Sequence, residues 1–101
     1  MENDGLKSRK FDYFDVTADI GFYAYGESLE EAYENAGLAM FNVITDIDNV
    51  KKTESRDFEI VSEDLVSLLY DYLEELLFLQ DTEFLFFSDF KVNIEILSSV
   101  F

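Results

Sequence analysis

The chain has 101 residues and a formal net charge of −16, from 23 acidic and 7 basic residues, and it contains neither cysteine nor histidine. These absences exclude disulfides, ordinary zinc sites and Ser-His or Cys-His nucleophiles, so that any bound metal would be a hard cation held by oxygen atoms. The negative charge repels phosphate backbones, and acids interrupt every long apolar run, so we expect no direct nucleic-acid binding, no membrane span and a cytoplasmic location.

A polar arm, residues 1–10, precedes a single predicted domain at residues 11–101. The arm holds the only basic cluster in the chain, Lys7, Arg9 and Lys10. We interpret this cluster as a tail in solvent rather than as a binding element, because short polar termini are rarely ordered.

Two carboxylates, Asp15 and Asp19, lie where a first predicted strand, near Phe11–Asp15, leads through a turn to a second, Phe22–Tyr25. Their aromatic and β-branched neighbours mean that each carboxylate needs a hydrogen-bond donor or a cation. The residues alone favour a structural role, in which each aspartate caps a turn. The alternative is that Asp19, close to Gly21, donates an oxygen to a calcium- or magnesium-type ion. Two carboxylates are too few for a complete site.

A helix is predicted after Gly26, because Ser28 and Glu31 have the spacing of a capping box. Apolar residues recur at helical spacing and predict one stripe, which we interpret as core. This stripe comprises Leu29, Ala32, Tyr33, Ala36, Met40, Val43 and Ile44.

Two weaker patterns follow this helix. Residues 46–49 read Asp-Ile-Asp-Asn, which faintly resembles the start of a calcium loop. They lack the central glycine and closing glutamate of an EF-hand, so a turn after the helix is favoured. Further on, Phe58 and Ile60 alternate with acids and predict a short strand with one face in water.

A second helix is predicted to begin at Ser62, with Glu63 and Asp64 in its first turn. It is so broadly apolar that we expect it to be the central helix, covered on more than one side. The acids of residues 81–83 are predicted to follow it, as a turn facing water or a surface for a basic partner.

Two more strands are predicted, from the apolar run Phe84–Phe87 and from the alternating residues Phe90–Ile96. The fold class is therefore predicted as α+β, with two helices packed on a mixed, largely antiparallel sheet. The last strand leaves an apolar edge near residue 101, which either a partner or further sequence would have to complete.

The motifs of residues 11–96 resemble, in consistent order, those of the archease family. The segments that carry the resemblance are Asp15–Gly21, Tyr25–Gly26, Ser28–Ala32, Asn35–Ala36, Ala39–Phe41, Thr45–Asp46, Asp64–Leu65, Leu68–Asp71, Glu75–Leu77 and Asp81–Glu83. The resemblance implies a strand-helix-strand-strand core, with the family's C-terminal strands apparently missing from this chain.

The resemblance also implies a function, that of a protein cofactor for the RtcB-type RNA ligase of tRNA splicing. Archeases are associated with promoting guanylylation of that ligase by GTP, and they are not ligases themselves. The family's metal site uses the aspartate of a T-A-D motif. The matching residue here is Asp19, so the resemblance implies that Asp19 binds calcium or another hard divalent cation. Its other acidic ligands, near the family's carboxyl terminus, have no counterpart here, and Val16 stands where many members have histidine.

The residues and the resemblance leave three functional hypotheses. An activator would stimulate a ligase without turnover of its own. A small metal-dependent enzyme using Asp15 and Asp19 would turn over GTP or RNA alone. A strand-addition module would pair its open sheet edge with another chain.

Overall fold

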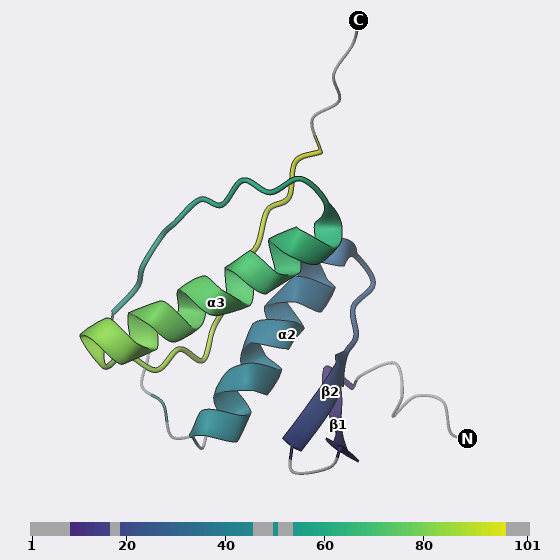
Figure 1. The fold of residues 1–101 in the computed structure, drawn as a ribbon, viewed down its shortest axis with the longest axis vertical. Helices are drawn as coiled ribbons and strands as arrows, with labels where there is room; N and C mark the ends of the chain where they lie inside the picture. Colours follow the sequence, from purple (N-terminus) through teal and green to yellow (C-terminus); the bar gives the residue numbers. More distant parts are fainter. Residues whose placement is uncertain (1–8, 17–18, 46–49, 51–53, 97–101) are drawn as a thin grey trace, which may run out of the picture.

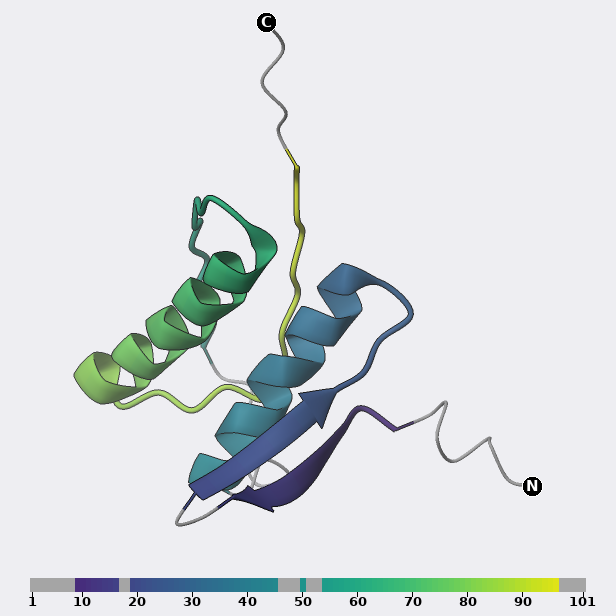
Figure 2. The same ribbon diagram turned by 45° about the vertical axis from the view of Figure 1, so that its right-hand side comes forward.

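The computed structural model describes residues 9–16, 19–45, 50 and 54–96, and for Val16, Asp19 and Ile20 it describes the backbone alone. Within these ranges the elements are strand β1 (Phe11–Val16), strand β2 (Asp19–Ala24), helix α2 (Leu29–Ile44) and helix α3 (Leu65–Glu83). Helix α2 lies in the middle, with the hairpin on one side and α3 on the other (Figures 1, 2). Two helices and an antiparallel sheet confirm the predicted α+β class.

The two strands form an antiparallel hairpin in which Phe14 pairs with Gly21. A side chain at Gly21 would displace the ring of Phe14, because its Cβ would lie 2.3 Å from that ring. That ring instead lies over the glycine and packs against Tyr23, with centroids 4.8 Å apart. The first strand is thus close to its predicted range, whereas β2 begins three residues before the predicted Phe22.

Helix α2 begins where its capping pattern predicts. Ser28 Oγ accepts a hydrogen bond from the Glu31 backbone N–H at 3.1 Å. The Glu31 side chain accepts in turn from the backbone N–H of Glu27 at 2.6 Å. Just before this turn, a Cβ at Gly26 would lie 2.4 Å from the Ala32 backbone nitrogen, so the entry into α2 requires glycine.

The prediction that the second helix is central was wrong, because α2 occupies that place. On the side of α2 that faces the hairpin, Asn35 Nδ2 donates a hydrogen bond to the Tyr25 carbonyl at 2.6 Å. On the same side, Tyr13 OH donates to the Ala39 carbonyl of α2 at 2.7 Å. Its other side carries Tyr33 and Phe41 into the core. A helix buried on two sides has no single apolar stripe, so the predicted stripe omitted Phe41 and included exposed ends.

The main core lies between α2 and α3, around the buried side chains of Tyr33, Phe41, Tyr72 and Leu76. Tyr33 and Tyr72 stack with ring centroids 5.9 Å apart. Gly37 allows the helices to approach, because a Cβ there would lie 2.7 Å from Tyr72 OH and 3.0 Å from the Phe90 ring.

Gly37→Ala is therefore expected to destabilise the fold by about 1 kcal/mol, although alanine is the better helix former. The overpacked contact should cost about 1–3 kcal/mol, which exceeds the helix-propensity gain of about 1 kcal/mol. Urea denaturation measures the difference. Tyr72→Phe should recover part of the loss in a double-mutant cycle, since it removes the nearest clashing atom. A Gly37→Ala protein more stable than the parent would contradict this packing.

Helix α3 starts and ends later than predicted. Its N-cap is Asp64, which accepts from the Ser67 backbone N–H at 2.8 Å. This hydrogen bond lowers the pKa of the Asp64 carboxyl. The predicted start at Ser62 was wrong by three residues, and residues 81–83 form the last helical turn rather than a turn after it. Phe84 ends the helix in the left-handed conformation, with φ 57°.

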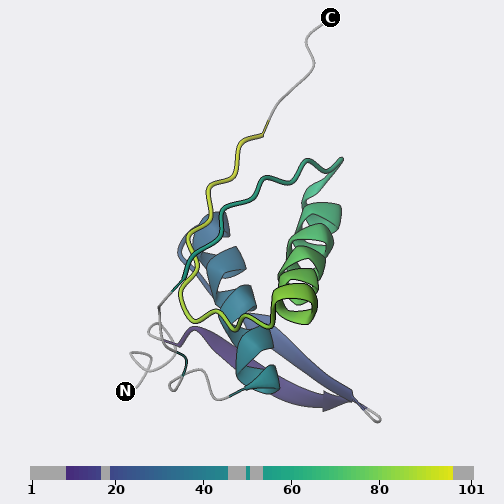
Figure 3. The same cartoon turned by 90° about the vertical axis from the view of Figure 1, so that its left-hand side faces the viewer.

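The three strands predicted at residues 58–60, 84–87 and 90–96 do not form; these residues have neither regular secondary structure nor sheet pairing. Alternation at 90–96 nevertheless predicted three of its four apolar positions, since Phe90, Val92 and Ile94 pack on the core. It was wrong for Ile96, which is 76% exposed. The backbone N–H of Val92 donates to Glu34 Oε2 at 2.8 Å. That of Ile94 donates to Glu30 Oε2 at 3.3 Å. Carboxylates of α2 thus accept the backbone hydrogen bonds that a neighbouring strand would accept in a sheet. The segment, drawn in yellow, runs alongside α2 (Figure 3).

Candidate functional site

The two sequence-predicted aspartates lie at the end of the hairpin, where β1 leads to β2. Asp15 is exposed and pairs with Ile20, while Asp19 is the first residue of β2 and pairs with Val16. The predicted place of Asp19 at a strand-to-turn junction is thus confirmed for its backbone. Its side chain lies outside the description, as do all of residues 46–49.

The carboxylates that are described do not gather as a metal site. Among the described residues, no group of three acidic side chains is arranged to hold an ion. Asp15 alone is not a site, so metal binding at the hairpin would require Asp19 and ligands beyond the described side chains.

The open end of the hairpin, opposite the turn, holds a small polar network. Arg9 forms an ion pair with Asp12, and Tyr25 OH donates to the same carboxylate at 3.2 Å. The hydrogen bond to Asp12 raises the pKa of the Arg9 guanidinium. The pKa of Tyr25 is raised by desolvation first, and then by Asp12. One cation of the predicted basic cluster is thus committed to an intramolecular partner.

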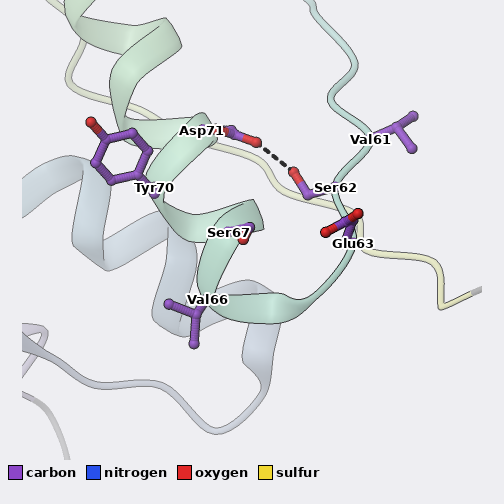
Figure 4. A pocket seen from close by; sticks show the side chains of 7 residues that line it. All are labelled: Val61, Ser62, Glu63, Val66, Ser67, Tyr70 and Asp71. Atoms are coloured by element: carbon purple, nitrogen blue, oxygen red, sulfur yellow. Dashed lines mark hydrogen bonds between the residues drawn. The ribbon is translucent and has the colours of Figure 1, made fainter.

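An open pocket of about 490 Å³ lies where the chain enters α3 (Figure 4). Ser62 Oγ donates to Asp71 Oδ2 at 2.7 Å across it and ties the entering loop to the second turn of the helix. The pocket is lined by Val61, Ser62, Glu63, Val66, Ser67, Tyr70 and Asp71. Sequence reasoning missed this pocket, because Ser62 and Asp71 are nine residues apart and meet only after α3 has formed.

The far end of α3 is tied to the extended segment before it. Arg56 Nη2 lies 2.7 Å from Glu83 Oε1 and 3.2 Å from Glu54 Oε1. The hydrogen bonds to Glu83 and Glu54 raise the pKa of the Arg56 guanidinium. This cation offsets the negative charge that Glu83 places at a helix carboxyl end.

Buried tyrosines of the core stay protonated at neutral pH and have structural roles. Burial, followed by the nearby charge of Glu34, raises the pKa of Tyr72. Desolvation and then Asp64 raise that of Tyr33, whose hydroxyl donates to the Leu65 carbonyl at 2.5 Å. Neither residue is poised as an acid or base near pH 7.

Neither described helix combines the length and apolar character that crossing a bilayer requires. The described part is thus an acidic α+β domain with an open pocket at the start of α3. Comparison with known proteins defines its family.

The model of the Archease protein family (MTH1598/TM1083) matches residues 11–99. The chain belongs to the archease family, which confirms the resemblance drawn from its motifs. No solved structure matches it.

Curated relatives of this family have sequences similar to that of the chain. The chain is 64% identical over 85 residues to "Protein archease" of Methanothermobacter thermautotrophicus, covering 84% of this chain and 61% of that protein. It is 51% identical over 87 residues to the archease of Pyrococcus furiosus and 49% identical over 87 residues to that of Pyrococcus abyssi, covering 86% of this chain and 61% of each relative. The chain thus spans about three fifths of the length of these relatives.

Proposed function

We propose that the protein is a cofactor that activates an RtcB-type RNA ligase in tRNA splicing, by promoting its GTP-dependent guanylylation. The observation that carries the proposal is the family match over residues 11–99, together with 64% identity to a curated archease. In this role the ligase performs the chemistry, and the present protein, acting in the cytoplasm, is not itself the enzyme.

The charge of the chain supports a protein partner of this kind. A net charge of −16 creates a field that steers the protein toward basic surfaces. An RNA ligase must expose such a surface to bind phosphate backbones. The same charge discourages competition for the RNA itself.

We propose Asp19 as a ligand for calcium or another hard divalent cation, on the strength of its place in the T-A-D motif. The described side chains supply no set of three ligands with which it could be completed. Asp19 would therefore be one ligand, and a complete site would need further oxygen ligands beside it.

The proposal is tested by measuring ligase guanylylation with and without the protein. A faster rate, together with no GTP or RNA turnover by the protein alone, is the expected result. Turnover by the isolated protein would instead identify the metal-dependent enzyme. No effect on a ligase from the same source, with the protein folded by circular dichroism, would overturn the activator role.

The protein alone is expected not to bind RNA appreciably at physiological salt. Its net charge of −16 opposes binding, and Arg9 of the basic cluster is already paired with Asp12. Fluorescence anisotropy with labelled tRNA measures this directly. Tight binding that survives deletion of residues 1–10 would refute the prediction, because the arm holds the only basic cluster.

A further inference from the structure

Helix α3 has an apolar stripe that runs along its exposed side and borders the core at one position. Its residues are Val66, Tyr70, Leu73 and Leu77, whose spacing of four, three and four places them along one face. Val66 is 80% exposed, Tyr70 66% and Leu77 42%, while Leu73 lies at the border of the core. Large apolar side chains on successive turns form the kind of surface that binds an amphipathic helix.

The charges beside the stripe indicate what would cover it. Glu74 and Asp81 are exposed along one edge of the stripe, and Glu63 is exposed just before the helix begins. The sequence contains no lysine or arginine between Arg56 and Lys91. A complementary surface is therefore apolar with basic flanks. A second copy of this chain fits poorly, because it would bring the same acids and another −16 charges.

The pocket at the start of α3 extends this surface at the Val66 end (Figure 4). Its lining combines valines with the carboxylates of Glu63 and Asp71 and the ring of Tyr70. This combination suits a lysine or arginine side chain. The aliphatic stem would lie on the valines, and the cation would meet a carboxylate or the aromatic face. Asp71 is already positioned by its hydrogen bond from Ser62.

We propose that this face of α3 is the docking site for an amphipathic helix of a partner protein, with an apolar face, basic flanks and one lysine or arginine in the pocket. The inference stands on the surface of α3 alone and does not depend on the proposed function. It can therefore fail or succeed without a ligase in the experiment.

Three synthetic peptides of equal length test it by isothermal titration calorimetry. The first is a helix with leucine on one face and lysine and arginine on its flanks. The second has glutamate in place of every basic residue. The third has the composition of the first with the leucines scrambled off a single face. Saturable binding of the first peptide alone is expected, whereas equal binding of the scrambled peptide would show attraction by charge only and overturn the proposal.

Variants then locate the binding surface. Val66→Ser and Tyr70→Ser should each weaken binding of the first peptide by about tenfold, since each removes apolar area from the contact. Val43→Ser is the matched control, because Val43 is 51% exposed on α2. It should leave the affinity unchanged. All three proteins should keep the helicity of the parent, as these positions are exposed.

Two results would overturn the assignment. Equal loss of affinity in Val43→Ser and Val66→Ser would place binding elsewhere. Self-association in sedimentation that Val66→Ser abolishes would show that a second copy occupies the face.

Discussion

Phe41→Ala is expected to lower the free energy of unfolding by about 3–5 kcal/mol. Phe41 is fully buried. Its ring lies 5.7 Å from that of Phe87, edge-on, and 5.9 Å from that of Phe90, stacked. Alanine would leave a cavity at the point where α2 meets the segment that follows α3. A domain of this size has about 5–15 kcal/mol of stability in total, so the variant should be near its folding threshold.

Urea denaturation followed by circular dichroism measures this loss. Val43→Ala serves as control, because it truncates a half-exposed side chain two residues further along the same helix. Its effect should stay within about 0.5 kcal/mol. A Phe41→Ala protein as stable as Val43→Ala would show that the aromatic cluster does not hold the helices together.

Asp19→Ala is expected to abolish or greatly weaken activation of the ligase while leaving the fold in place. In the proposed role the residue is a charged metal ligand, and neighbouring residues cannot replace it. We expect a loss of roughly tenfold or more in the rate of guanylylation, as for other lost contacts of a metal site. Asp19 begins β2 and lies in neither helix, so its removal takes nothing from the α2–α3 core.

Three measurements separate the roles that Asp19 could have. Guanylylation rates report activation, calcium titration reports metal binding, and circular dichroism reports folding. Asp57→Ala, which removes an exposed carboxylate far along the chain, is the matched control. Full activation by a folded Asp19→Ala protein would refute the metal role. If Asp19→Ala unfolds while Asp57→Ala stays folded, Asp19 has the structural role of a turn cap.

Local signals predicted the elements whose ends depend on neighbouring residues. The capping box of Ser28 and Glu31 located the start of α2, because both partners lie within one turn. At α3 both Ser62 and Asp64 have side chains that can cap a helix, and only the hydrogen bond from Ser67 shows that Asp64 is the cap. The end of α3 was misplaced since no glycine or proline marks it, and Phe84 takes the left-handed conformation instead.

Features that depend on distant parts of the chain were harder to predict. The alternation of residues 90–96 identified Phe90, Val92 and Ile94 as core-facing, although it also included Ile96, which is exposed. It does not show whether the backbone meets a strand or, as here, carboxylates of α2. The same limit applies to the candidate sites. The backbone position of Asp19 followed from its turn, whereas the α3 pocket depends on a contact between Ser62 and Asp71.

Two hydrogen bonds join distant parts of the chain. Glu34 accepts from the Val92 backbone N–H, 58 positions away, and Glu30 accepts from that of Ile94, 64 positions away. The hairpin and α2, by contrast, are sequence neighbours that can fold together through short loops. Because closing a long loop costs more entropy than closing a short one, we expect the hairpin and α2 to associate early and residues 90–96 to dock last. The same segment should be the first to detach in local opening, so that its amide protons exchange with solvent well before those of α2.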